Sequence, residues 1–394
     1  MKVYPAVFLL SALCLLDSCS RDKEPSTTES SGATPSLEEA YLKDYKSSRI
    51  KWGYLDQQGE VALSGKWDDC NDFSEGKAAV NIKGRWGYIL TDGSTLVKPQ
   101  YRAAWSFKNG VARVLQMDGV YALLNASGEK FLELGKQSPA QPSDGLIRVT
   151  GAGTTSYLDL QGRTQIQANY STGTDFQDGA AIVSQQMLYG LINKSGAEIL
   201  PMTYDRIRYA GSGYYRLYKD QAETLYHHPL GTSPEIGAQR YSSVQDGQVA
   251  ARTSGLWELY KIDGTKVASW PEAVDARAAG QGHWHVQFPK GVRLSDNQGN
   301  YLSEELYTMI NPYAEDRAGA AIGEAWGYLD LSGQWIVPPK YPILWDYSEG
   351  LARAIGPQGV QYIDPQGNVV FRTPYFEARD FHDGLARVEL RKFF

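Results

Sequence analysis

This sequence has no excess of basic residues, no long hydrophobic segment and only three cysteines. The formal net charge is −6 at pH 7, so we expect no nucleic-acid partner, because proteins that bind nucleic acid usually carry a basic face. The apolar run from Val3 to Leu16 has about 14 residues and is too short to cross a bilayer core of about 30 Å as a helix. The three cysteines allow at most one disulfide.

Residues 1–18 have the features of a signal peptide, a positive Lys2 followed by the apolar run. The run ends in Leu16-Asp17-Ser18-Cys19, which resembles a bacterial lipobox. This resemblance implies a lipoprotein of the bacterial cell envelope, held at the outer membrane by palmitate-type lipid on Cys19. The alternative is an ordinary signal peptide with a chance cysteine. If Cys14 leaves with the signal and Cys19 carries lipid, Cys70 stands alone and no disulfide forms within the mature monomer.

Three segments are expected after the signal. Residues 19–36 are rich in Ser, Thr, Glu and Pro, and such a composition cannot bury enough apolar surface to order itself, which predicts a flexible tether. Ser36 and Glu39 make a capping box that predicts a short helix within residues 37–48. This helix would cover the first apolar edge of a repeat array over residues 49–394.

Two series of glycines mark about ten repeats of roughly 34 residues. The first series recurs every 33 to 35 residues, at Gly59, Gly93, Gly128, Gly162, Gly196, Gly231, Gly264, Gly299, Gly333 and Gly367. The second series comprises Gly76, Gly110, Gly145, Gly179, Gly213, Gly247, Gly282, Gly350 and Gly384, with Asp316 in its one gap. Two series in step along the array indicate a repeat architecture.

Each repeat is predicted to be a three-stranded antiparallel β-meander. Two and four residues after each second-series glycine stands an apolar residue, such as Ala78 and Val80, and this alternation is typical of a strand with one buried face. A second strand carries the Trp-Gly-Tyr segment of residues 52–54 and ends in an Asp-x-x-Gly turn. A third short strand follows. The 26 Tyr, 11 Phe and 10 Trp supply a core, so we expect an all-β fold.

The ends of the array leave two arrangements open. The first repeat begins at its second strand, and the chain ends with a lone first strand, Leu385 to Leu390. Closed β-propellers join their ends in this way. However, ten blades exceed the usual four to eight, and the repeats are short for four-stranded blades. We therefore favour a curved superhelical array over a closed β-propeller-like ring.

The repeats resemble the WG-repeat family, which is named for its Trp-Gly pair. The pair is intact at Trp52-Gly53, Trp86-Gly87 and Trp326-Gly327, and the pattern is degenerate in repeats six to eight, where Thr224, Trp257 and Val292 hold the Trp position. The resemblance implies a β-repeat scaffold, common in secreted or envelope proteins, with no general catalytic site. We therefore expect an envelope-tethered, non-catalytic binding scaffold for a protein or glycan partner. The alternative is a hydrolase acting on surface polymer, with a site assembled from several repeats.

Two sets of side chains are candidates for contact with a ligand. Five arginines stand three residues after second-series glycines, on the face opposite the buried Ala and Val, and stacking of repeats would align them: Arg113, Arg148, Arg216, Arg353 and Arg387. Such a line could bind an anionic partner. Alternatively, and in our preferred interpretation, the arginines pair with acidic residues that precede the same glycines, such as Glu349 and Asp383. Three tryptophans fall where loops between repeats are expected and are candidates for exposure: Trp105, Trp270 and Trp345.

No metal, cofactor or catalytic residue is predicted. His283 and His285 share one face of a strand, but a site needs a third ligand and none stands at a recognisable spacing, so two solvated histidines are expected. The recurring Asp residues, such as Asp56 and Asp330, are explained as turn caps. The sequence contains no nucleophile elbow, phosphate loop or zinc-protease motif.

Overall fold

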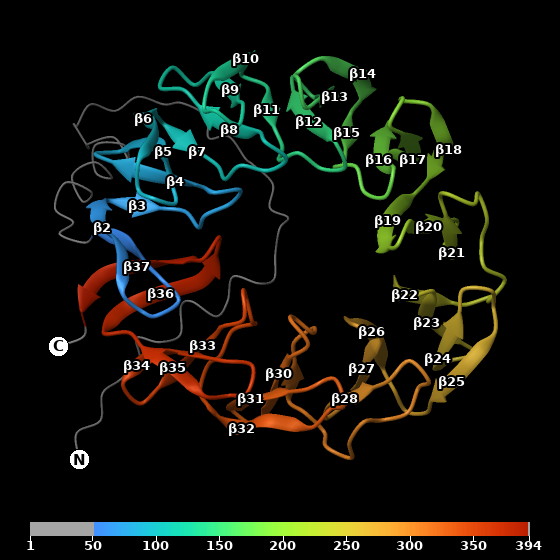
Figure 1. Cartoon of the computed structure of the whole chain (residues 1–394). Coiled ribbons are helices and arrows are strands. Elements are labelled where there is room, and N and C mark those ends of the chain that lie inside the picture. The colour runs from blue at the N-terminus through green and yellow to red at the C-terminus, as the bar shows by residue number, and fades with distance from the viewer. Residues whose placement is uncertain (1–50, 393–394) are drawn as a thin grey trace, which may run out of the picture. The chain divides into compact units, whose positions relative to one another are not determined.

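The computed structural model describes residues 51–392. The predicted signal peptide, the tether, the capping helix and Cys19 lie outside the described residues. Within residues 51–392 the regular secondary structure is entirely β, in ten small antiparallel sheets that form a ten-bladed β-propeller (Figure 1). The all-β prediction is confirmed. This part of the chain contains no helix long and apolar enough to cross a membrane.

The first five blades follow one another along the chain. Blade 1 contains β3 (Asp69–Cys70), β4 (Lys77–Ile82), β5 (Arg85–Leu90) and β6 (Thr95–Tyr101). Blade 2 contains β7 (Ala103–Ala104), β8 (Ala112–Leu115), β9 (Tyr121–Leu124) and β10 (Lys130–Gly135). Blade 3 contains β11 (Ser138–Pro139), β12 (Leu146–Gly151), β13 (Thr154–Asp159) and β14 (Thr164–Tyr170). Blade 4 contains β15 (Thr172–Gly173), β16 (Ala180–Gln185), β17 (Leu188–Asn193) and β18 (Glu198–Tyr204). Blade 5 has three strands, β19 (Arg206–Gly211), β20 (Tyr214–Lys219) and β21 (Ala222–His227).

The other five blades complete the ring. Blade 6 contains β22 (Arg240–Gln245), β23 (Gln248–Thr253), β24 (Leu256–Lys261) and β25 (Lys266–Trp270). Blade 7 has three strands, β26 (Asp275–Gly280), β27 (His283–Phe288) and β28 (Gly291–Ser295). Blade 8 contains β29 (Met309–Ile310), β30 (Ala318–Ile322), β31 (Ala325–Leu329) and β32 (Trp335–Tyr341). Blade 9 contains β33 (Ala352–Gly356), β34 (Gly359–Ile363) and β35 (Val369–Arg372). Blade 10 contains β36 (Tyr375–His382), β37 (Leu385–Lys392), β1 (Trp52–Leu55) and β2 (Val61–Trp67).

Blade 10 closes the ring with strands from both ends of the described chain. β1 pairs antiparallel with β37, so that Trp52 lies opposite Glu389 and Leu55 opposite Ala386. Closure pairs the lone last strand with β1 and leaves neither as a free edge. Our preference for an open superhelical array was therefore wrong, and the closed-ring alternative is confirmed.

Most blades have one strand more than the predicted meander. The extra strand is the first of each blade, only two residues long in blades 1 to 4 and blade 8. Figure 1 shows these first strands on the inner side of the ring, for example β7 and β15 against the outer β10 and β18. A two-residue strand has too few residues to show the alternation that reveals a strand in sequence.

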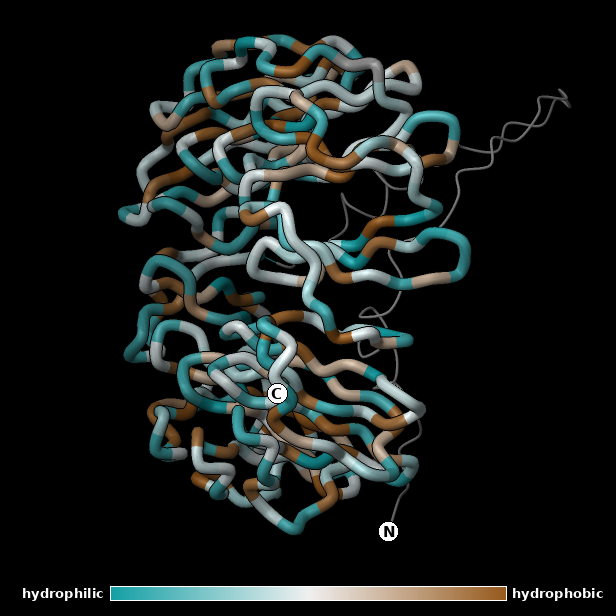
Figure 2. The backbone as a smooth tube through the Cα atoms, turned by 90° about the vertical axis from the view of Figure 1, so that its right-hand side faces the viewer, coloured by the Kyte–Doolittle hydropathy of each residue, from teal (hydrophilic) through white to brown (hydrophobic). Residues whose placement is uncertain are grey.

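The core is divided into layers between neighbouring blades. In the layer between blades 1 and 2, Tyr88 and Phe107 are buried with their rings edge to face at 5.0 Å, and the Tyr88 hydroxyl donates to the Trp105 carbonyl oxygen (2.8 Å). The same tyrosine position donates to the next blade from Tyr54 and Tyr157. In Figure 2 hydrophobic stretches follow the strands, and hydrophilic residues gather at the turns on both edges of the blades. Each blade therefore has two buried faces.

Close backbone approach explains the glycine of the Trp-Gly pair. A Cβ atom on Gly87 would lie 2.3 Å from the Val97 carbonyl oxygen, and on Gly327 it would lie 2.1 Å from the Val337 carbonyl oxygen. No side chain fits at that distance. The Asp-x-x-Gly turn also forms as predicted, because the Asp56 carboxylate accepts the backbone N–H groups of Gln58 (3.0 Å) and Glu60 (2.9 Å).

Candidate functional site

The five candidate arginines do not form an exposed line; each reaches across to a neighbouring blade or is held at the interface between blades. Arg148 pairs with Asp175 (2.8 Å) and Arg353 with Asp380 (2.6 Å). Arg387 pairs with Asp72 (2.8 Å) across the junction between blade 10 and blade 1. Arg113 donates to the Pro139 carbonyl oxygen and Arg216 to the Tyr241 carbonyl oxygen, both at 2.5 Å. The arginines therefore join blades.

This placement corrects both interpretations of the arginines. The alternative of an exposed line took one strand face as free, but blades stack on both faces, and Arg353 is only 4% exposed. Three of the arginines do form ion pairs, but with acidic residues other than those expected from the sequence. The acidic partners of Arg148, Arg353 and Arg387 stand four residues before the second-series glycine of the next blade.

The acidic residues that directly precede the second-series glycines have a different role. The Glu349 carboxylate accepts the backbone N–H groups of Asp383 (2.7 Å) and Gly384 (2.8 Å) in the next blade. Glu315 does the same for Glu349 and Gly350. Equivalent bonds run from Gly110 to Glu75 and from Gly179 to Asp144. These carboxylates therefore cap the next turn around the ring.

The three candidate tryptophans are not free surface residues. Trp270 is 1% exposed in the core of blades 6 and 7, and its indole N–H donates to the Gly299 carbonyl oxygen (3.1 Å), so the predicted exposure is wrong. Trp105 and Trp345 are half-buried, and the guanidinium groups of Arg113 and Arg353 stack over their rings at 4.2 Å. Trp105 with Arg113 and Trp345 with Arg353 are therefore stacked pairs, with the geometry of a cation–π contact.

The two histidines of β27 are not solvated as expected. His283 is 8% exposed, and its Nε2 atom lies 2.8 Å from the Leu331 carbonyl oxygen. Burial, with the nearby charge of Arg277, lowers the pKa of His285 to about 4. Among residues 51–392 there is no group of three side chains suited to a metal ion.

Blades 5 to 7 depart from the regular blade. Blades 5 and 7 lack the outer fourth strand, whereas the three-stranded blade 9 lacks only the short first one. The first strands of blades 5, 6 and 7 are six residues long instead of two, and that of blade 10 has eight residues. These blades include the degenerate repeats six to eight, in which Thr224 and Val292 replace Trp. A repeat scaffold is held together by its regular positions, so departures from them are where a functional surface is expected.

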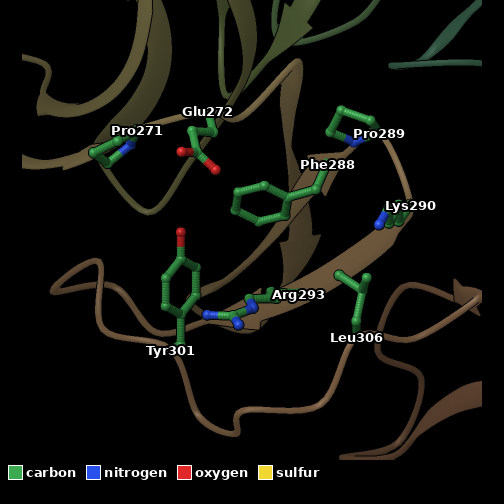
Figure 3. Close-up of a pocket in the computed structure, with 8 residues that line it drawn as sticks. All are labelled: Pro271, Glu272, Phe288, Pro289, Lys290, Arg293, Tyr301 and Leu306. Atoms are coloured by element: carbon green, nitrogen blue, oxygen red, sulfur yellow. The ribbon is translucent and has the colours of Figure 1, made fainter.

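A pocket of about 600 Å³ lies on blade 7 beside the connection from blade 6 (Figure 3). Its volume is within the range of small-ligand sites, about 300–1,000 Å³. The missing fourth strand of blade 7 leaves room there, because the chain runs as a loop past β28 and its backbone pairs with that strand through isolated bridges at Tyr301 and Tyr307. The lining residues are Pro271, Glu272, Phe288, Pro289, Lys290, Arg293, Tyr301 and Leu306.

Aromatic and charged groups meet in this pocket, which we call the blade 7 pocket. The rings of Phe288 and Tyr301 lie 6.2 Å apart, with the Arg293 guanidinium 4.9 Å from the Tyr301 ring and 5.8 Å from the Phe288 ring. Arg293 also forms an ion pair at 3.5 Å with Glu304, whose side chain is 95% exposed. In Figure 3 the Glu272 carboxylate points into the space between the two rings. The pocket offers flat apolar surface for stacking and both signs of charge for hydrogen bonding.

Glu272 is held in a conformation that a side chain rarely adopts. Its φ angle is +66°, in the left-handed region, which costs a residue other than glycine about 1–3 kcal/mol. Positive φ angles recur at turn residues around the ring, for example at Glu75 and Glu349, so this angle reflects the tight turn after β25.

Sequence reasoning missed the blade 7 pocket because its residues belong to no motif. The pocket exists because a strand is absent, and the residues that line it come from a connection, a hairpin turn and a loop. The available signal was the loss of Trp-Gly at Val292 in the degenerate repeats.

Comparison with known structures returns other proteins at low similarity. BamB from Moraxella catarrhalis is 16% identical over 73% of this chain and 95% of its own, with a TM-score of 0.32. A eukaryotic initiation factor is 9% identical over 87% of this chain and 98% of its own, with a TM-score of 0.47. PorZ, described as a surface component of the type-IX secretion system of Porphyromonas gingivalis, is 10% identical over 61% of this chain and 40% of its own, with a TM-score of 0.27. No curated protein sequence matches the chain.

Comparison with protein families agrees with the resemblance seen in the sequence. The family described as WG containing repeat matches residues 52–86, 86–121, 189–221, 326–354 and 362–392. The matches omit residues 222–325, which include the last strand of blade 5, all of blades 6 and 7 and the pocket. The chain therefore carries WG-containing repeats at five positions of its β-propeller.

Proposed function

We propose that this β-propeller is a non-catalytic binding scaffold for a protein or glycan partner, tethered to the bacterial envelope, and that its blade 7 pocket is the binding site. The observation that carries the proposal is the coincidence of the pocket with the blades that depart from the repeat. Stacking on Phe288 and Tyr301, with hydrogen bonds donated by Arg293 and accepted by Glu272, suits a sugar ring or an aromatic peptide side chain.

Affinity capture from a bacterial envelope extract tests the pocket. We expect the protein to retain a protein or glycan that is lost in the double variant Phe288→Ala/Tyr301→Ala, because the stacking surface is removed. Met117→Ala, which truncates an exposed side chain on blade 2, serves as a control and should capture the same partner. Equal capture by the double variant would contradict the pocket, and no specific capture by any form would contradict the scaffold.

The same extract separates binding from hydrolysis. Hydrolysis of a glycan usually uses two carboxyl groups on either side of the bond, whereas Glu272 is the one carboxyl residue that lines the blade 7 pocket. We therefore expect no release of reducing ends from envelope polysaccharide. Release that is abolished by Glu272→Gln would favour the hydrolase instead.

The tether is the second part of the proposal. Cys19 stands at the end of the lipobox-like segment, and lipidation there would hold the propeller at the outer membrane. In cells fed a palmitate analogue, Cys19→Ala should abolish labelling and release the protein from the membrane fraction, because one lipid-bearing residue provides the anchor. Cys70→Ala is the control and should keep both the label and the membrane association. Persistent membrane association of Cys19→Ala would contradict the anchor.

A further inference from the structure

A second exposed surface lies on blades 5, 6 and 7, on their inner strands β19, β22 and β26 and on the neighbouring β23. It consists of five arginines, which we call the arginine rim: Arg206, Arg208, Arg240, Arg252 and Arg277. Arg206 and Arg240 stand seven residues before the second-series glycine of their blades, and Arg208 and Arg277 stand five residues before it. The rim is therefore a repeated feature of three consecutive blades, in a chain whose net charge is −6.

The three inner strands, which carry four of the five rim arginines, lie side by side. A Cβ atom on Gly211 of β19 would lie 2.6 Å from the Val244 carbonyl oxygen of β22. The Gly280 N–H of β26 donates to the side-chain oxygen of Gln245 in β22 (3.0 Å). Figure 1 shows β19, β22 and β26 in succession along the inner side of the ring. The arginines of neighbouring blades can therefore contact one extended ligand.

Cross-strand pairing in these blades places like charges opposite each other. Arg240 lies directly opposite Arg252, and Arg208 directly opposite Arg216, whose charge is partly balanced by Glu223 at 3.7 Å. Like charges at opposite positions destabilise a sheet. The fold does not require them, because the Arg208 position is Trp105 in blade 2, Thr174 in blade 4 and Trp345 in blade 9. A bound anion would relieve this repulsion.

The rim arginines keep most of their hydrogen-bonding groups free for a ligand. Arg206 stacks on the Tyr218 ring at 4.0 Å and Arg240 lies 5.9 Å from the Trp257 ring, contacts that orient a guanidinium without neutralising its charge. Arg277 pairs with Asp275 (2.8 Å). Within residues 51–392, Arg206, Arg208, Arg240 and Arg252 have no ion pair with a carboxylate.

We propose that the arginine rim binds an acidic glycan, a polysaccharide that bears carboxylate groups. A planar guanidinium donates two parallel hydrogen bonds to a carboxylate, and sugar hydroxyls accept the remaining N–H groups. A nucleic-acid duplex fits less well. It carries about one charge per 1.7 Å, and so dense a row of phosphates would meet Asp205 and Asp220, which lie side by side where β19 begins and β20 ends. The proposal concerns a surface separate from the blade 7 pocket and does not depend on it.

The test compares two triple variants of the full-length protein with matched loss of charge. Arg206→Gln/Arg208→Gln/Arg240→Gln removes the centre of the rim. Arg85→Gln/Lys98→Gln/Arg102→Gln removes three exposed cations in and next to blade 1. The probes are a fluorescent oligogalacturonate, a neutral dextran of the same length and a 20-base-pair DNA duplex, each titrated at low and physiological salt.

We expect oligogalacturonate to bind with an affinity that falls as salt rises, because exposed charges are screened within about 8 Å at physiological ionic strength. The rim variant should weaken binding at least about tenfold, and the blade 1 variant less than about twofold. The blade 1 variant should keep the melting temperature of the parent, and the rim variant should melt at or above it, because it removes like charges from opposite positions. If the rim variant fails to fold, Arg208→Gln alone should lower the affinity and its salt dependence.

Three results would overturn the proposal. They are no oligogalacturonate binding at low salt, equal losses in the two triple variants, and tighter binding of the duplex than of the glycan. If the arginine rim fails these tests while a partner is still captured through Phe288 and Tyr301, the blade 7 pocket remains the proposed binding site. The two proposals can therefore be contradicted separately.

Discussion

At the scale of residues, Arg353 shows how a repeated arginine serves the fold. Its guanidinium donates to both carboxylate oxygens of Asp380 (2.6 and 3.0 Å) and to the Ala378 carbonyl oxygen (2.7 Å), while it covers Trp345. The repeat position of Arg353 drew attention to it in the sequence. Whether its guanidinium contacts a ligand or forms an ion pair depends on which face of the strand is covered by the next blade, and the sequence of one repeat does not contain that information.

Replacing Arg353 should therefore destabilise the protein without any ligand present. We expect Arg353→Ala to lower the free energy of unfolding by about 2–3 kcal/mol, because it leaves the Asp380 carboxylate and the Ala378 carbonyl without their partner. Arg163→Ala, which removes an ion pair with Asp159 from an arginine side chain that is 78% exposed, should cost less than about 1 kcal/mol. Urea unfolding followed by tryptophan fluorescence measures both values, and equal values would contradict the structural role of Arg353.

At the scale of elements, the turn between the first and second strands links each blade to the next. Glu349 sits in such a turn with a φ angle of +53° and receives two backbone N–H groups from blade 10. Gly350 and Gly384 follow acidic residues of this kind and have positive φ angles, so the second glycine series marks this turn, although the turn was not predicted because the short first strand was missed. The capping of the neighbouring turn could not be predicted, because it joins residues about one repeat apart.

Neutralising this carboxylate should weaken the contact between blades 9 and 10. We expect Glu349→Gln to cost about 1 kcal/mol, the typical difference between charged and neutral hydrogen bonds. Glu324→Gln changes an exposed glutamate in the turn between β30 and β31 and should have no measurable effect. Thermal melting of the two variants and the parent decides the matter, and a Glu324→Gln effect as large as that of Glu349→Gln would count against capping.

At the scale of the whole molecule, stability depends on the closure between β1 and β37. Removing residues 385–394 deletes β37, which pairs with β1 on one side and β36 on the other. We expect faster amide exchange in Trp52–Leu55, because β1 loses its partner and becomes a free edge. In an open array the same deletion would affect only the last repeat or two.

Hydrogen exchange measured by mass spectrometry tests closure directly. Exchange in β12 (Leu146–Gly151), on blade 3 and away from the junction, provides the internal reference. Unchanged protection of Trp52–Leu55 after the deletion, with β37 absent, would mean that the ends do not depend on each other and would contradict the closed ring.

The sequence by itself determined the number of repeats, their all-β build and their turn chemistry. These features arise from contacts a few residues apart, such as Asp56 with the backbone of Gln58 and Glu60, and local contacts leave a periodic trace. Only the tertiary structure decided that the ends meet, that Arg353 and Trp270 are covered, and that blade 7 lacks an outer strand. These outcomes depend on the small rotation from each blade to the next, summed over ten blades, and on which strand face a neighbouring blade covers. No single repeat encodes that sum, so both the ring and the pocket on its irregular side become visible only when all blades are in place.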